Sequence, residues 1–87
     1  MTIFTKKEAD SAIKYYSEKV IGKPITKPDN SNPFLISSLE ITKLKEDEYT
    51  VYCLSKYIGN IFRRNLDEVI TELDILPLEE FLSNLNQ

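Results

Sequence analysis

LISSLEITKLKEDEYTVYCLSKYI, residues 35–58, is the stretch that decides the fold. On either side of the charged run 45–48, apolar and polar side chains alternate. Alternation with a period of two is typical of strands that bury one side of a sheet, and a charged run between two such segments is typical of a turn. The stretch therefore predicts a long antiparallel β-hairpin.

The length of the turn sets which residues of the hairpin face the core. A four-residue loop over 45–48, built around a type I turn, places Leu44 opposite Tyr49, and a two-residue loop gives the same register. A three-residue loop with a bulge would exchange the two faces, but the turn holds no glycine to support one. In the predicted register, the face assigned to the core carries Leu35, Leu39, Ile41, Tyr52, Leu54 and Ile58. The opposite face carries Tyr49, Val51 and Tyr57.

The segment before the hairpin contains the clearest helix signal. Thr5 precedes Glu8 by three residues, which is the spacing of a capping box, and Gly22 stands where a left-handed C-terminal cap is favoured. These signals predict a helix over 6–20. Its apolar residues recur at helical spacing, at Ala9, Ala12, Ile13, Tyr16 and Val20. The next segment, 23–33, contains three of the four prolines and predicts a loop.

The segment directly after the hairpin leaves two interpretations open. Gly59-Asn60 suits a tight turn into a short third strand over 61–64. The register of that turn would place Lys56 beside Arg63, and like charges directly opposite each other destabilise a sheet. The alternative is that a helix begins at Asn60.

Two short helices are predicted near the C-terminal end of the sequence. Asn65 is a favourable cap, because the acids that follow it complement the helix dipole, and we expect the helix to run from Leu66 to near Asp74. Pro77 is well placed to begin a last helix. Its apolar stripe consists of Leu78, Phe81, Leu82 and Leu85.

Size and composition predict one small domain. The chain has 87 residues, of which 41% are hydrophobic and 29% charged, enough for one core and too few for two. We therefore expect a single α+β domain over 1–87, with an N-terminal helix, a long antiparallel β-hairpin with or without a short third strand, and two C-terminal helices packed on the sheet.

The residue inventory excludes most enzyme chemistry. The chain has no histidine, one cysteine and two glycines, so a serine protease triad, a zinc site and a glycine-rich phosphate loop cannot be built. We expect no catalytic residues, no metal and no cofactor. Because Cys53 cannot form an internal disulfide and no apolar run suits a signal peptide or a membrane span, we expect a cytoplasmic protein and no membrane partner.

Two surfaces are candidates for binding. Tyr49, Val51 and Tyr57 share one face of the predicted hairpin and would form an exposed strip suited to another protein or to a second copy of the chain. From Asn65 onward the chain holds six acidic residues and no basic one, which suits a basic partner. We therefore expect a non-enzymatic protein–protein interaction or regulatory module that uses an exposed sheet face or edge and the acidic C-terminal helices, as a homodimer or with another protein.

The alternative function is single-stranded nucleic-acid binding. Lys56, Arg63 and Arg64 lie near aromatic residues in the sequence, and basic and aromatic side chains together can grip phosphate and stack on a base. The net charge of -3 and the pI of about 4.9 argue against nucleic acid as a partner.

Overall fold

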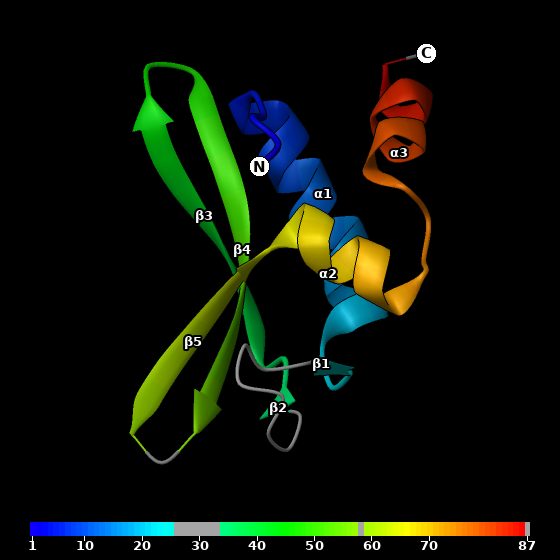
Figure 1. The fold of residues 1–87 in the computed structure, drawn as a ribbon. Helices are drawn as coiled ribbons and strands as arrows, with labels where there is room; N and C mark the ends of the chain where they lie inside the picture. The colour runs from blue at the N-terminus through cyan, green and yellow to red at the C-terminus, as the bar shows by residue number, and fades with distance from the viewer. Residues whose placement is uncertain (26–33, 58, 87) are drawn as a thin grey trace.

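The computed structural model describes residues 1–25, 34–57 and 59–86, and it confirms the predicted α+β fold class (Figure 1). The elements follow the order α1 (Lys6–Val20), β1 (Pro24–Ile25), β2 (Phe34–Leu35), β3 (Ser38–Lys45), β4 (Glu48–Tyr57), β5 (Asn60–Asn65), α2 (Leu66–Leu73) and α3 (Leu78–Leu85). No helix in the described part of the chain is long and apolar enough to cross a bilayer.

The architecture is a twisted three-stranded sheet with its helices on one side. The sheet is antiparallel in the order β3-β4-β5, so β4 is central. In Figure 1 the two hairpins diverge from the middle of β4, and α1 and α2 lie on the same side of the sheet. The helix α3 joins this layer by packing Phe81 against Tyr15 and Tyr16 of α1. The core lies between this helical layer and the sheet.

The first helix has the bounds that its sequence predicts. Thr5 Oγ1 accepts a hydrogen bond from the Glu8 backbone N–H, and Glu8 Oε1 accepts one from the Thr5 N–H, which confirms the capping box. Gly22 takes a positive φ of 86° just past the end of the helix, and its N–H donates to the carbonyl of Ile36. The four buried residues of the helix are Ala9, Ala12, Tyr16 and Val20.

The predicted register of the hairpin is wrong by one residue over most of its length. Lys43, not Leu44, lies opposite Tyr49, and Ile41 lies opposite Val51. The register shifts between Lys43 and Lys45, which is the bulge that the missing glycine had argued against. Asp47 adopts a φ of 56° in the turn, and because aspartate tolerates the left-handed region, it supplies the conformation in place of glycine.

This shift exchanges the faces of β4. The side chains of Val51 and Cys53 are buried in the core, and Ser55 is buried where its hydroxyl donates to the Leu35 carbonyl. Tyr52 and Leu54, which we predicted to be in the core, lie on the opposite face. On β3 the prediction is correct, because Leu39 and Ile41 pack against the core. Leu35, also predicted to be in the core, is exposed, and Ile58 lies outside the described residues.

The third strand forms, and its register separates the two basic residues. Lys56 lies opposite Ile61, and Arg63 lies opposite Leu54, so the like-charge pair expected from a Gly59-Asn60 turn does not occur. The turn instead closes between Tyr57 and Asn60.

Both C-terminal helices form where they were predicted. The cap position before α2 is Asn65, although no side-chain capping bond is present there and its Oδ1 is buried without a partner in the described residues. Asp74 ends α2 in the left-handed conformation, and Pro77 precedes α3.

The predicted loop over 23–33 is partly regular structure. Pro24–Ile25 pairs with Phe34–Leu35 in a two-stranded antiparallel sheet, which corrects the prediction at that end. The pairing is favoured because Ile25 and the neighbouring Ile36 are both buried in the core. Residues 26–33 lie outside the described part of the chain.

Candidate interaction surface

The face of the sheet that points away from the helices, which we call the open face, is the main candidate surface. Among the described elements, no helix packs on it (Figure 1). The pairing of the three strands places these residues on it: Ser38, Glu40 and Thr42 of β3, Thr50, Tyr52, Leu54 and Lys56 of β4, and Ile61, Arg63 and Asn65 of β5. Of these, Thr50 is buried.

A cross-strand group lies at the middle of the open face. The Arg63 guanidinium carbon is 5.9 Å from the centre of the Tyr52 ring, and one guanidinium nitrogen is 4.0 Å from a Glu40 carboxylate oxygen. The Tyr52 hydroxyl donates to the Met1 sulfur at 3.9 Å. A cation over an aromatic face is a weak attraction at an exposed site, so this group is held loosely and can exchange its contacts for those of a ligand.

The predicted strip of Tyr49, Val51 and Tyr57 does not lie on the open face. Val51 is 1% exposed and belongs to the core, and Tyr49 is half-buried against that core. The side chain of Tyr57 lies outside the described residues. Sequence reasoning missed Tyr52 and Leu54 as candidates because their assignment depended on the bulge near Leu44.

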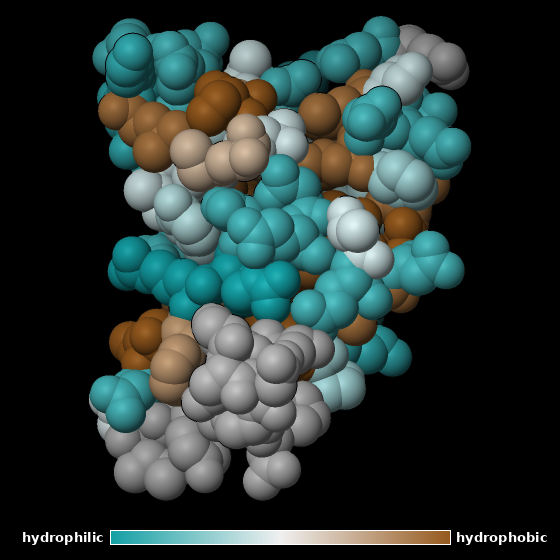
Figure 2. Space-filling model, in the orientation of Figure 1, coloured by the Kyte–Doolittle hydropathy of each residue, from teal (hydrophilic) through white to brown (hydrophobic). Residues whose placement is uncertain are grey.

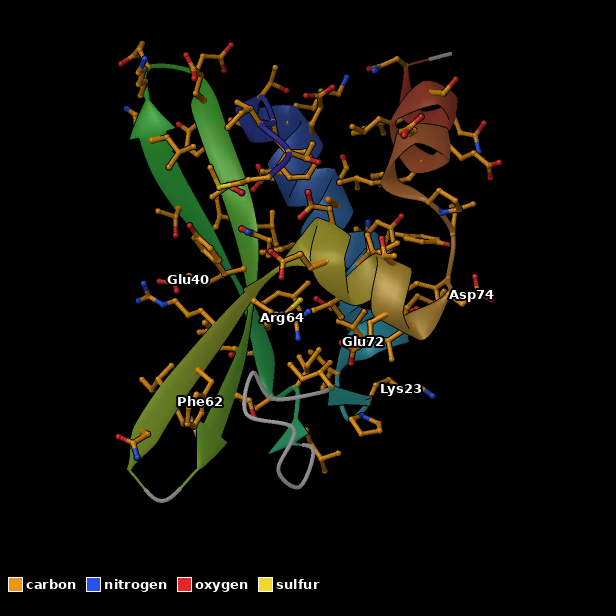
Figure 3. The ribbon with its side chains drawn as sticks, in the orientation of Figure 1. Lys23, Glu40, Phe62, Arg64, Glu72 and Asp74 are labelled. Carbon is orange, nitrogen blue, oxygen red and sulfur yellow. The ribbon has the colours of Figure 1, made fainter. Side chains whose placement is uncertain are left out.

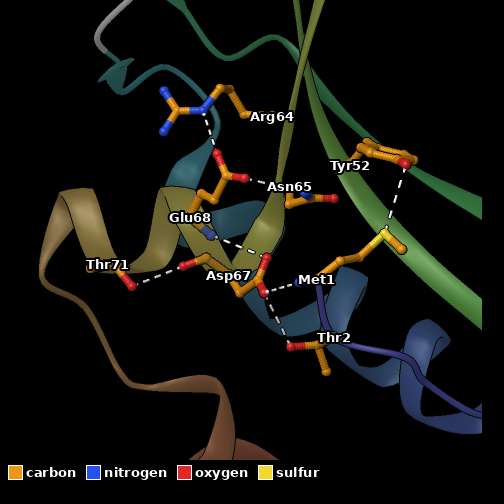
Figure 4. Close-up of polar contacts among 8 residues, drawn as sticks. All are labelled: Met1, Thr2, Tyr52, Arg64, Asn65, Asp67, Glu68 and Thr71. Atoms are coloured by element: carbon orange, nitrogen blue, oxygen red, sulfur yellow. Dashed lines mark hydrogen bonds and ion pairs between the residues drawn. The ribbon is translucent and has the colours of Figure 1, made fainter.

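The three basic residues of the alternative prediction are divided between the two faces. Lys56 and Arg63 are on the open face. Arg64 is on the helix side, where its guanidinium forms ion pairs with Glu68 at 3.0 Å and Glu72 at 3.4 Å (Figures 3 and 4). Consecutive residues of a strand point to opposite faces, so Arg63 and Arg64 cannot act on one ligand at one face. Figure 2 shows hydrophilic residues gathered across the middle of the molecule, where β5 passes into α2.

The cysteine is buried and lies opposite Arg64. Burial raises the pKa of the Cys53 thiol to about 12, and the nearby positive charge of Arg64 offsets only part of this effect. The thiol therefore stays protonated at neutral pH, and a protonated thiol is a poor nucleophile.

A groove in the helical layer is the second candidate surface. Its volume is about 380 Å³, and it lies among the N-terminal segment, α2 and the turn that leads into α3. Its apolar lining consists of Ile70, Ile75, Pro77 and Leu78, and its polar lining consists of Thr2, Asp67, Thr71, Asp74 and Glu79. Within the described residues, no group of three or more potential metal ligands is arranged to hold a metal ion.

The carboxylate of Asp67 is already engaged at one end of this groove (Figure 4). It accepts hydrogen bonds from Thr2 Oγ1 at 3.3 Å and from the Glu68 N–H at 3.2 Å, and it lies 3.5 Å from the Met1 nitrogen. The Thr71 hydroxyl donates to the Asp67 carbonyl at 3.0 Å. The contacts with Met1 and Thr2 join the N-terminal segment to α2, and Thr2, Asp67 and Thr71 line one part of the groove.

Comparisons with protein-family models, with curated proteins and with solved structures found no match to this chain.

Proposed function

We propose that the protein is a non-enzymatic protein–protein interaction or regulatory module that binds its partner through the open face. The observation that carries this proposal is that the described helices all lie on one side of the sheet, which leaves Ile61 exposed and Tyr52 and Leu54 half-buried on the other. Tyrosine and arginine are enriched at protein interfaces, and here Arg63 adjoins the apolar group. The partner is another protein or a second copy of the chain.

The β3 edge of the sheet supports strand addition less well than the open face supports docking. The edge strand β3 ends in a bulge flanked by Lys43 and Lys45, and bulges and lysines on edge strands discourage pairing with another chain. We therefore place the partner on the open face and not along β3.

The chemistry of the chain supports a role without catalysis. Histidine is absent from the sequence, and the Cys53 thiol is buried and protonated at neutral pH. A lone cysteine that cannot form an internal disulfide also supports the cytoplasm as the site of action.

Two changes on the open face are expected to weaken binding. Replacing Tyr52 with alanine removes an aromatic anchor, which is expected to reduce affinity about 30-fold if the residue is a hot spot. Ile61→Ser is expected to have a smaller effect in the same direction. Self-association is measured by analytical ultracentrifugation, and binding to another protein is measured with the stoichiometric companion recovered by affinity purification from the native cell.

Leu35→Ser is the matched control for Ile61→Ser. Both residues are 58% exposed aliphatic side chains, but only Ile61 lies on the open face. The control is expected to keep full affinity. Unchanged affinity in both open-face variants, with normal melting curves, would show that the partner docks elsewhere.

Single-stranded nucleic-acid binding remains the second candidate, because Lys56 and Arg63 share the open face with Tyr52. It predicts that Arg63→Ala weakens binding of a fluorescent oligonucleotide and that affinity falls steeply with salt. Arg64→Ala, a change on the opposite face, should leave binding intact while the fold is retained. Fluorescence anisotropy measures the effects of both variants and of salt on the affinity for the oligonucleotide. If the anisotropy does not change at low salt, this candidate is eliminated.

A further inference from the structure

The groove beside α2 combines an apolar floor with a rim of unengaged acids. Asp74 and Glu79 both line it, and neither has an ion pair or a side-chain hydrogen bond with any described residue. Asp74 stands where α2 turns toward α3 (Figure 3). Ile70, Ile75 and Leu78 supply apolar surface between the acids.

The surrounding charge is strongly negative. The helices α2 and α3 with the turn between them carry six acids and no base. Arg64, from the neighbouring strand, offsets Glu68 and Glu72 and lies outside the groove lining, and the Met1 ammonium offsets Asp67 at 3.5 Å. Asp74, Glu79 and Glu80 have no ion pair with a described residue. The field at Asp74 and Glu79 therefore attracts cations and repels phosphate.

We propose that this groove receives the lysine or arginine side chain of a basic segment in a partner polypeptide. The acids would hold the cationic head, and the apolar floor would cover its methylene stem, since long basic side chains bury their stems and keep their charge near polar groups. The volume of about 380 Å³ is near the lower end of the usual range for ligand pockets, which suits one side chain better than a large cofactor. This site belongs to the helical layer, so it does not depend on the open face.

The first test uses a short blocked peptide, acetyl-Gly-Arg-Gly-amide, titrated into the full-length chain and followed by amide NMR. Peak shifts are expected along 71–79, at the groove. The citrulline counterpart has nearly the same shape and no charge, and it should leave these peaks in place. Failure of the arginine peptide to move them, or equal shifts with both peptides, would overturn the proposal.

The second test compares single carboxylate-to-amide changes. Asp74→Asn keeps a residue that tolerates the left-handed backbone, and Glu79→Gln keeps the length of the side chain. Each change is expected to reduce the affinity for the arginine peptide about two- to five-fold, which corresponds to the usual free energy of an exposed ion pair.

Glu80→Gln is the matched control, because it removes the same charge from the next residue of α3, which does not line the groove. The control should bind the peptide like the unaltered chain. Equal weakening by Glu79→Gln and Glu80→Gln would show a diffuse acidic field in place of a site. Loss of open-face binding leaves this result unaffected, so the two proposals fail separately.

Discussion

Replacing Tyr16 with alanine is expected to lower the free energy of unfolding by about 3–5 kcal/mol, the usual range for truncating a buried aromatic residue. Tyr16 is fully buried, and its ring packs edge-on against Tyr15 at 4.9 Å and Phe81 at 5.4 Å between ring centres. Its hydroxyl donates to the Leu76 carbonyl at 2.6 Å. The side chain thus joins α1 to both α3 and the turn before it. A small domain has a total stability of about 5–15 kcal/mol, so this one change is expected to remove a large share of it.

Tyr16→Phe separates the contribution of the hydroxyl to stability from that of the ring. It keeps the ring contacts and leaves the Leu76 carbonyl without its donor, so a loss of about 1–2 kcal/mol is expected. Tyr15→Phe is the control, since the Tyr15 hydroxyl has no hydrogen-bond partner among the described residues. Urea unfolding followed by circular dichroism measures all three variants. An alanine variant as stable as the phenylalanine variant would contradict the packing role of the ring.

Alkaline pH is expected to destabilise the fold through Cys53. Burial raises the pKa of this thiol from about 9 to about 12, with Arg64 acting in the opposite direction. Above pH 9 the unfolded chain therefore releases a proton that the folded chain retains, and the free energy of unfolding falls as pH rises. The free energy of unfolding is expected to fall by about 1.4 kcal/mol for each pH unit above 9, which is on the order of 4 kcal/mol by pH 12.

Cys53→Ala isolates this effect from the other groups that titrate at high pH. Burial raises the pKa of Tyr16 to about 12 as well, so part of the alkaline loss between pH 10 and 12 will remain in the variant. The variant is expected to lose about 1 kcal/mol at neutral pH and to show a shallower decline above pH 9. Urea titrations across this range measure both slopes. Parallel slopes in the two proteins would refute the assignment to Cys53.

Local signals in the sequence were sufficient for the helices. Thr5 and Glu8 form their capping box within one turn, and the start of α2 at Leu66 follows from Asn65 and the acids after it. These signals can be recognised because the interacting groups are three or four residues apart. The sequence left open whether the segment after Gly59 forms a third strand or a helix. The strand forms, and because Arg63 pairs with Leu54 it does not lie opposite Lys56.

The candidate site depended on an interaction that is not local. The alternation in β4 showed that its residues divide into two faces, and it could not show which face is buried. The bulge near Leu44 decided this, because a one-residue shift in pairing reverses every side chain of one strand relative to the other. The open face, with Tyr52 and Leu54 in place of Tyr49 and Val51, follows from that shift.

The sequence by itself determined the helices and the central hairpin, the absence of histidine chemistry and the excess of acid after Asn65. Only the tertiary structure decided which side of the sheet the helices cover and which acids border a groove. Composition and short-range periodicity are properties of neighbouring residues. The burial of Val51 and the placement of Asp74 and Glu79 depend on residues far apart in the chain, which meet only when the core forms.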